Sequence, residues 1–423
     1  MAALQERGIA NFQRHGVPTP RLEAWRYTSL KALKQFDLQA ENGAESTAAG
    51  ASEGIPSLAD VSARLVFVNG RLVRGLSMQG SLPAGTRCEG IEEALAGDGG
   101  AVIRQHLGRV GAGENPEQSL IALNAGSFRD GAVIELAANT VLSAPIELVF
   151  AISADQQATQ AHVRNLIVAG AHSQVTVIER FVRLGSTDTA SFTNAVTEVR
   201  CEAGAQVGLV QVQNQGSAAV HVGSVAVEQQ ADSRFETVAV QLGAALGRVD
   251  VAVALEGAGA SCSVDGLYVG GGSQHLDHNV VIRHVASHCT SSELFKGVLD
   301  GRSVGVFRGR VLFLEGAVGS NTSQLSRSLL LSKHATANTK PQLEIDNDDV
   351  KATHGATVGQ IDEQALFYLC ARGIPKSVAR GMLTLAFAQE VIDRISVASL
   401  RRELSSVVAT RLGVETADFG EAA

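Results

Sequence analysis

Alternating runs of β-branched and small residues that recur along the chain constrain its fold more than any other feature. From about Val133, five stretches share one design, an alternating run, a small-residue turn and a second alternating run: VIELAANT, NLIVAGAHSQVTVIERFV, VTEVRCEAGAQVGLVQVQ, SVAVEQQADSRFETVAV and VDVAVALEGAGASCSVDGLYV. Their turns centre on Asn139, Gly170, Gly204, Ala231 and Gly259, at intervals of 31, 34, 27 and 28 residues. No helical stretch separates the strands, so the repeat favours stacked coils.

The fold class that follows is mainly β: a right-handed parallel β-helix core with N-terminal and C-terminal helical regions. The hand comes from the crossover rule for parallel strands. A β-sandwich is the alternative, because single strands also recur about every 8–12 residues, as they do in sandwiches. The composition agrees with closely stacked β structure, since the chain has 44 glycines and only 4% aromatic residues. A net charge of −8 argues against nucleic acid as the main partner.

The chain divides by pattern into five segments. LQERGIANFQRHG and RLEAWRYTSLKALKQF indicate helical structure, the second with apolar residues at three-residue steps, and VFVNGRLV indicates a hairpin at Asn69-Gly70. IEEALAGDGGAVIRQHLG and PEQSLIALNAG read as two short helices. The predicted segments are an N-terminal helical region (1–40), a flexible linker (41–60), a mixed hairpin and helix segment (61–130), the β-helix core (131–358) and a C-terminal helical region (359–423).

The C-terminal region is predicted to hold three helices. The strands are expected to end near Val350, and DEQALFYLCARG then begins a helix with Asp362 at its N-cap and Gly373 past its end. The next helix carries an apolar stripe at four-residue steps, and ASLRRELSSVVATRLG is the third: the stripe is Leu383, Phe387, Val391 and Ile395. These helices either cap the open end of the solenoid or bind a partner, and capping is the more usual role.

The cysteines and the N-terminus predict a location. Five scattered cysteines include no C-x-x-C pair, and the sequence shows neither a signal peptide nor an apolar run of membrane-spanning length. We therefore expect a cytoplasmic protein without disulfides or contact with a membrane. The chain also lacks the G-x-x-x-x-G-K-[ST], G-x-S-x-G and H-E-x-x-H motifs.

GLYVGGGSQHLDHNVVIRHVASHCTSS is rich in side chains that bind metals: His275, Asp277, His278, His284, His288 and Cys289. On a strand, Asp277 and His278 point to opposite faces, and His275 shares the face of Asp277. His284 shares a face with His278, and His288 and Cys289 point apart if their strand is regular. These residues do not converge locally, so polar side chains on a solenoid face are favoured over a metal site.

His354, in VKATHGATVG, is expected at the join between the last strands and the first C-terminal helix. A neutral imidazole there can bind iron, zinc or copper. From the residues alone it is a single histidine without a partner, and a structural role is favoured.

KPQLEIDNDDVKATHGATVGQIDEQALFYLCARGI, followed by AFAQEVI, closely resembles the SufB/SufD family of the Suf iron–sulfur cluster assembly scaffold, on its SufD side. WRYTSL resembles the N-terminal helical region of that family, and QHLDHNVVIRH, TSSELFKGVL and FRGR resemble its β core. The resemblance covers nearly the whole chain. It implies a non-catalytic scaffold subunit that pairs with a SufB subunit.

The resemblance also implies the site residues. His354 matches the family histidine that faces a cysteine of SufB in cluster assembly. Some relatives carry a cysteine two residues earlier, where this chain has Ala352, so a thiolate from that position is excluded. The C-terminal helices would bind the SufC ATPase, with candidate contact residues Phe367, Leu383, Phe387 and Val391. No cofactor is expected to bind tightly to the isolated chain, and iron or a nascent cluster would bind transiently in the complex.

Three alternatives stay open. A homodimeric, structural SufB/SufD-like protein would prefer itself to a SufB partner. A β-helix carbohydrate-active enzyme would need paired carboxylates, or a carboxylate with Arg or Lys, on one solenoid face. A metal enzyme built on His275, Asp277 and His278 would hold stoichiometric metal as an isolated chain.

Overall fold

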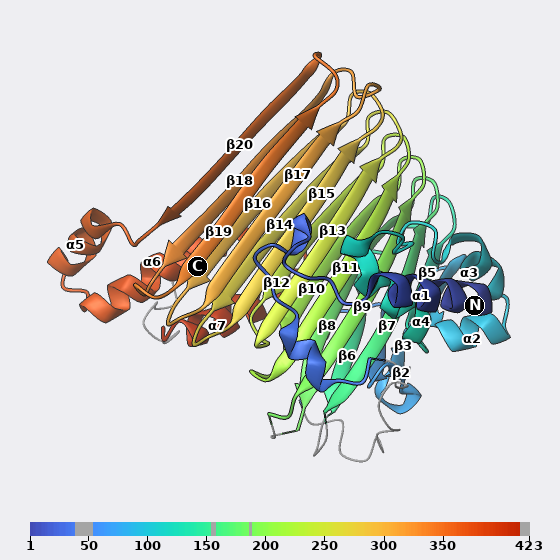
Figure 1. Ribbon diagram of the computed structural model, residues 1–423, viewed down its shortest axis with the longest axis horizontal. Coiled ribbons are helices and arrows are strands. Elements are labelled where there is room, and N and C mark those ends of the chain that lie inside the picture. Colours follow the sequence, from blue (N-terminus) through green and yellow to red (C-terminus); the bar gives the residue numbers. More distant parts are fainter. Residues whose placement is uncertain (39–53, 154–157, 186–187, 415–423) are drawn as a thin grey trace.

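The structure is a computed structural model that describes residues 1–38, 54–153, 158–185 and 188–414. Long strands dominate it, and they stack in two facing sheets (Figure 1). The strands are β1 (Ala63–Val68), β2 (Arg71–Leu72), β3 (Met78–Gln79), β4 (Thr86–Gly90), β5 (Ala132–Leu136), β6 (Ile146–Ser153), β7 (Thr159–Ala169), β8 (Gln174–Leu184), β9 (Ser191–Cys201), β10 (Gln206–Asn214), β11 (Ala219–Gln229), β12 (Arg234–Gln241), β13 (Leu246–Leu255), β14 (Ser261–Gly270), β15 (His275–His284), β16 (Thr290–Leu299), β17 (Val304–Phe313), β18 (Ser320–Leu330), β19 (Thr336–Ile345) and β20 (Val350–Gly359).

Helices lie before and after these strands and in the segment leading into them. The α-helices are α1 (Ala2–His15), α2 (Ile91–Ala96), α3 (Gly100–His106), α4 (Ser119–Ser127), α5 (Glu363–Ala371), α6 (Lys376–Ile392) and α7 (Ala398–Arg411). The 3₁₀ helices are η1 (Glu23–Trp25), η2 (Lys31–Gln35), η3 (Arg74–Leu76) and η4 (Pro116–Gln118).

Successive long strands alternate between the two sheets, which makes the core a parallel β-helix. Sheet A has the order β2-β1-β6-β8-β10-β12-β14-β16-β18-β20, with β3 also paired to β1, and sheet B runs β19-β17-β15-β13-β11-β9-β7-β5-β4. Successive strands of sheet A pair in parallel from β8 to β20. The sequence offsets between paired residues are 32, 28, 27, 29, 31 and 30. The predicted solenoid is therefore confirmed, and the sandwich alternative is wrong because these long strands pair in parallel.

The predicted turns lie where the chain passes from sheet B to sheet A. Asn139, Gly204 and Gly259 have left-handed backbone with φ of 62°, 69° and 74°. At the other two turns the left-handed residue follows the predicted centre, at His172 and Asp232. The turns also stack tightly, because a Cβ at Gly204 would lie 2.3 Å from His172 Nδ1. Glycine is required there by both the φ angle and the space.

The main core fills the lumen between the two sheets. Its members are the inward-facing residues of both sheets, which alternate with outward-facing ones along each strand. Phe67, Phe150 and Phe181 stack from coil to coil, with 5.1 Å between successive ring centroids. The predicted hairpin is confirmed, since Phe67 pairs with Leu72 across β1 and β2. Strand β1 also pairs in parallel with β6, so this hairpin extends sheet A.

The N-terminal segment covers the outer face of sheet B. Helix α1 ends as predicted at Gly16, where φ is 66°. The following segment forms the 3₁₀ turns η1 and η2, and its apolar side chains pack on those of sheet B: Trp25, Leu30, Leu33 and Phe36 against Phe192, Val220, Val222 and Leu246. The three-residue steps from Leu30 to Leu33 and from Leu33 to Phe36 match the three residues per turn of a 3₁₀ helix. Most of the predicted linker 41–60 lies outside the described residues.

The predicted C-terminal helices are confirmed as α5, α6 and α7. The Asp362 side chain accepts hydrogen bonds from the backbone of Gln364 and Ala365 at the start of α5. Gly373 follows the helix with a φ of 86°. The expectation that strands end near Val350 is wrong, because β20 begins at that residue and continues to Gly359. No helix of the described residues has the length and apolar character needed to cross a membrane.

Candidate functional site

His354 lies in the middle of β20, with its side chain exposed, rather than at the junction with the first helix. Strand β20 is the last strand of sheet A, and β19 is the last of sheet B. Within the described residues, no strand pairs with the outer edge of either one. Figure 1 shows β20 at the margin of the sheets, and we call this last coil the open end. An uncovered edge presents free backbone N–H and C=O groups to a partner.

The C-terminal helices do not cap the open end, so the capping expectation is wrong. Helices α6 and α7 pack on the outer face of sheet A, where Val391 and Leu404 meet valines and leucines of β10 to β16. Lys296 donates a hydrogen bond to the Phe387 carbonyl at 3.0 Å, and its ammonium group lies 4.3 Å from the Phe387 ring centroid. These contacts hold the helices beside the β-helix, and the last coil stays uncovered.

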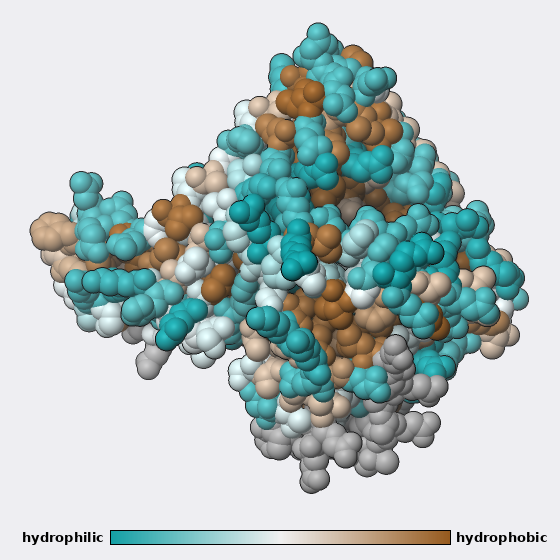
Figure 2. Space-filling view, in the orientation of Figure 1, coloured by the Kyte–Doolittle hydropathy of each residue, from teal (hydrophilic) through white to brown (hydrophobic). Residues whose placement is uncertain are grey.

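The four predicted partner-binding residues have different surroundings. Val391 is fully buried against sheet A, and Leu383 and Phe387 are half-buried among the helices. Phe367 on α5 is 75% exposed, and Tyr368 beside it is 56% exposed. Figure 2 shows brown and tan surface on the projecting α5 region. Of the four, Phe367 is therefore the residue that a partner can reach directly.

The inward face of the open end carries polar and small side chains. Ala352 and His354 pair in register with Thr322 and Gln324 of β18, which are both buried. Thr322 continues a chain of hydroxyl contacts to Ser291, at 2.7 Å, and on to His284 Nε2, at 2.8 Å. Polar side chains therefore occupy part of the lumen beneath the open end, as the buried Asn165, Glu179 and Gln211 do in earlier coils.

The metal-binding side chains of the histidine-rich stretch lie on β15 and in the turn after it, and the alternation predicted for the strand is confirmed. His275 and Asp277 share the outer face, where both contact the Thr28 hydroxyl. His278 points into the lumen, between the rings of Tyr268 and Phe295. Burial lowers the pKa of His278 to about 3, so its imidazole is neutral at physiological pH.

The remaining members of this stretch lie apart from one another. His284 stacks on Phe313, and burial lowers its pKa to about 4. His288 has a left-handed backbone in the turn after β15, and the Cys289 Sγ lies 3.4 Å from the Gly257 carbonyl oxygen. Across the described part of the chain, no three His, Cys, Asp or Glu side chains gather in a group that could hold a metal ion.

The cysteines are mostly inaccessible. Cys88, Cys201, Cys262 and Cys289 are buried, Cys370 is half-buried, and none forms a disulfide. Burial raises the pKa of both Cys88 and Cys201 to about 12, so these side chains stay as thiols. These two buried thiols are therefore unsuited to act as thiolate ligands.

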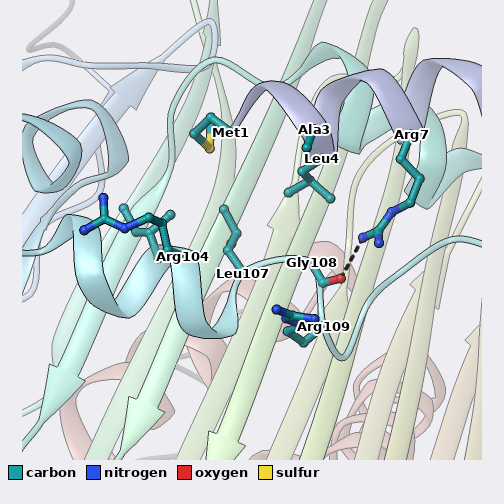
Figure 3. Close-up of a pocket in the computed structure, with 9 residues that line it drawn as sticks. Met1, Ala3, Leu4, Arg7, Arg104, Leu107, Gly108 and Arg109 are labelled. Atoms are coloured by element: carbon teal, nitrogen blue, oxygen red, sulfur yellow. Dashed lines mark hydrogen bonds between the residues drawn. The ribbon is translucent and has the colours of Figure 1, made fainter.

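A hollow at the N-terminal end is a second candidate site (Figure 3). Its volume is about 250 Å³, and it lies between α1 and the end of α3. Arg7, Arg104 and Arg109 line it together with apolar side chains, and Arg7 donates a hydrogen bond to the Gly108 carbonyl at 3.0 Å. It is separate from the open end, and its arginines belong to no sequence motif.

Gln324 and Glu293, which precede His354 in register on β18 and β16, were not predicted as site residues. About thirty residues separate neighbours in adjacent coils. The offset is 31 residues from Glu293 to Gln324 and 30 from Gln324 to His354, so no local motif connects them. Tyr368 was missed as well, although it follows Phe367 directly.

Comparison with known proteins agrees with this architecture. A family profile described as "SUF system FeS cluster assembly, SufBD core domain" matches residues 150–387, and one described as "SufBD protein N-terminal region" matches residues 1–148. An iron–sulfur cluster assembly SufBD family protein of Synechocystis sp. is 32% identical over 401 residues, or 93% of this chain and 87% of that protein. The iron–sulfur cluster assembly protein SufD of Escherichia coli is 26% identical, over 96% of this chain and 92% of its own length. The iron–sulfur cluster assembly protein SufD of Bacillus subtilis is 30% identical, over 69% of this chain and 66% of its own length.

Proposed function

The chain belongs to the SufBD family of iron–sulfur cluster assembly proteins, and from this membership we propose that it is a non-catalytic scaffold subunit that pairs with a SufB-like subunit through its open end. The pairing would place His354 at the interface where a cluster forms. Iron and sulfur are the cargo of this assembly, delivered by other proteins. The cytoplasmic location stays a prediction.

The observation that supports pairing is the exposure of inward-facing apolar side chains in the last coil. Val358 is 45% exposed and Ile345 is 49% exposed. Their neighbours one coil earlier, Ser328 and Phe313, occupy the same register positions and are buried. A second β-helix added to the open end would bury Val358 and Ile345 as the chain's own coils bury Phe313. Strand pairing across the edges would supply backbone hydrogen bonds as well.

The chemistry of His354 fits a transient iron ligand. A neutral imidazole binds iron through one nitrogen, and it holds a cluster less firmly than four thiolates do. With Ala352 two residues earlier, we propose that the thiolate ligands come from the partner subunit. A site built from one imidazole and thiolates of another chain could release its cluster when the subunits move apart.

We propose further that α5 binds a SufC-like ATPase. Phe367 and Tyr368 are exposed on a helix that projects from the β-helix, and Leu366 on the same helix is buried against Leu329 and Ile361. One side of α5 is therefore fixed to the body of the protein while its aromatic side faces solvent. An exposed aromatic pair of this kind is typical of the energetic centre of a protein–protein interface.

Co-expression with SufB-like and SufC-like subunits under anaerobic conditions tests the pairing. Native mass measurement should recover a complex with one copy of this chain. The double variant with Val358→Asp and Ile345→Asp should no longer bind the SufB-like subunit, and the isolated variant chain should stay folded. Val141→Asp is the matched control, because Val141 is 57% exposed away from the open end. Retention of the SufB-like subunit by the double variant would contradict the pairing.

The two site residues have tests of their own. His354→Ala should slow cluster formation on the intact complex, whereas His334→Ala, another exposed histidine, should not. Phe367→Ala should lose the ATPase subunit and keep the SufB-like one, with Tyr27→Ala as the exposed aromatic control. Wild-type cluster formation by His354→Ala would refute the proposed role of that residue.

A homodimer is the main competing proposal, because the same open end could pair with a second copy of this chain. The co-expression measurement separates the two, since a homodimer would persist when the SufB-like subunit is present in excess. The family matches favour assembly over the carbohydrate-active alternative.

A further inference from the structure

Glu293, Gln324 and His354 occupy equivalent positions on three neighbouring strands of sheet A. Glu293 on β16 pairs in register with Gln324 on β18, and Gln324 pairs with His354 on β20. Neighbouring strands lie about 4.8 Å apart, and in-register residues point to the same face. The three side chains therefore form a column that leads from the lumen to the open end.

The facing sheet shows that the column points inward. A Cβ at Gly309 on β17 would lie 2.1 Å from Gln324 Nε2 and 2.8 Å from Glu293 Oε2. Both side chains thus cross the lumen toward sheet B, and glycine leaves the room they need. Both are almost completely buried, at 2% and 3% exposure.

The column carries carboxyl and amide groups only near its exposed end. Earlier members of the same register are mostly apolar and fully buried: Ile146, Val177, Leu209, Thr237 and Val264. A buried amide or carboxyl group costs free energy unless it is hydrogen-bonded. An apolar pair at the last two buried positions would fill the lumen without that cost, so packing alone does not account for Glu293 and Gln324.

Among the described residues, the hydrogen bonds of this pair leave one oxygen of each side chain without a partner, Glu293 Oε1 and Gln324 Oε1. Gln324 Nε2 donates to Glu293 Oε2 at 3.0 Å, while Gln324 Oε1 has no hydrogen-bond partner among the described residues. The oxygen and nitrogen of an amide point in different directions from its carbon. With the nitrogen turned toward β16, the oxygen is available to the strand on the other side, which is β20.

We propose that Gln324 is a positioning residue for His354: its free carbonyl oxygen accepts a hydrogen bond from one imidazole N–H, and Glu293 holds the amide in that orientation. The second ring nitrogen of His354 is then unprotonated and directed to the open end. Histidine ligands of metals are commonly oriented in this way by a carbonyl or carboxylate on the other nitrogen. The inference deepens the proposed role of His354 and rests on it for its biological meaning.

The tautomer of His354 tests this proposal in the isolated full-length chain, without any partner. The ring nitrogens of ¹⁵N-histidine-labelled protein are measured by NMR at a pH where imidazole is neutral. The signals of His354 are those that disappear from the spectrum of the His354→Ala variant. The wild-type protein should show one protonated and one unprotonated nitrogen. Gln324→Met keeps the length of the side chain without the amide, and it should give the averaged signals of two exchanging tautomers.

Variants of the neighbouring residues make the test specific. Glu293→Gln keeps an acceptor for the Gln324 amide and should keep the wild-type tautomer, whereas Glu293→Met should behave like Gln324→Met. Ser326→Ala removes another buried polar group of β18 and should leave His354 unchanged. Circular dichroism confirms the fold of each variant. A wild-type tautomer in Gln324→Met would overturn the proposal.

Cluster assembly on the complex separates this proposal from the proposed function. Loss of an outer-shell partner reduces metal affinity or activity about 10- to 100-fold, so Gln324→Met should slow assembly by about 10-fold. If His354→Ala assembles clusters normally while the tautomer still depends on Gln324, the positioning stands and the role of His354 in assembly fails. If His354→Ala fails and Gln324→Met assembles normally, the positioning is refuted.

Discussion

The guanidinium group of Arg248 and the carboxylate of Asp277 lie 2.5 Å apart on the neighbouring strands β13 and β15, with both side chains almost completely buried. The same two groups hold the N-terminal segment. Arg248 lies 3.9 Å from the ring centroid of Trp25, and the Thr28 hydroxyl donates to Asp277 Oδ2 at 2.5 Å. This pair therefore fastens the 3₁₀ turns of that segment to the outer face of sheet B.

Arg248→Met should loosen this attachment, because it leaves the Asp277 carboxylate buried without its cation. Removing one partner of a buried ion pair costs about 3–5 kcal/mol. Trp25 is the only tryptophan of the chain, so its fluorescence reports on this segment. In a urea titration, the Trp25 emission of the variant should change before the β-sheet circular dichroism does. Arg310→Met is the control, since its pair with Glu344 is partly exposed and is worth about 0–1 kcal/mol. If the urea midpoint of the Trp25 emission shifts equally in Arg248→Met and Arg310→Met, this expectation is contradicted.

The local features of the fold were predictable because short-range chemistry determines them. The left-handed turns at Gly204 and Gly259 and the N-cap at Asp362 each follow from a residue type that favours one backbone geometry. The alternation along β15 likewise placed Asp277 and His278 on opposite faces.

The arrangement of the open end was not predictable, because it depends on contacts between coils. The register offsets between successive coils vary from 27 to 32 residues, so no fixed repeat aligns Glu293 with Gln324 and His354. The side of the β-helix that α6 covers depends on which apolar residues of sheet A face outward. The amphipathic pattern of α6 predicts that Val391 is buried, but it does not identify the surface against which Val391 packs.

The buried histidine His278 should make the protein sensitive to acid. Its pKa is about 3 in the folded protein because burial disfavours the charged form, whereas an unfolded histidine titrates near pH 6.5. Below pH 6.5 the unfolded chain therefore binds a proton that the folded chain does not, and stability falls with falling pH, by up to about 1.4 kcal/mol per pH unit.

His278→Leu should remove the part of this dependence that His278 contributes, while the buried His221 and His284, whose pKa values burial also lowers, keep theirs. The variant should gain stability relative to wild-type protein as the pH falls from 7.5 to 5, as measured by urea midpoints at both values. His334→Leu changes an exposed histidine, and its urea midpoint should change between the two pH values as that of wild-type protein does. If His278→Leu and wild-type protein lose the same stability between pH 7.5 and 5, other groups govern the acid sensitivity.

The five cysteines should differ sharply in reactivity. Four of them are buried, and Cys370, near the end of α5, is half-buried. Because a thiol must be reached and ionised before it reacts, the folded protein should show one rapidly reacting thiol with a disulfide reagent such as DTNB. Cys370→Ser should abolish the rapid phase, and Cys289→Ser should keep it. Two or more rapid thiols in the wild-type protein would contradict the burial of the others.

Glu293 should make stability fall as the pH rises. Burial raises its pKa to about 8 in the folded protein, whereas an unfolded glutamate titrates near pH 4.3. Between these values the folded chain holds a proton that the unfolded chain has lost, so the free energy of unfolding falls with rising pH by up to about 1.4 kcal/mol per pH unit. Glu293→Gln keeps the acceptor for Gln324 and cannot ionise. Its stability should match that of wild-type protein near pH 4.5 and exceed it increasingly up to about pH 8, where the difference levels off. Denaturant midpoints across this range measure the difference, and a constant difference would show that Glu293 is already ionised in the fold.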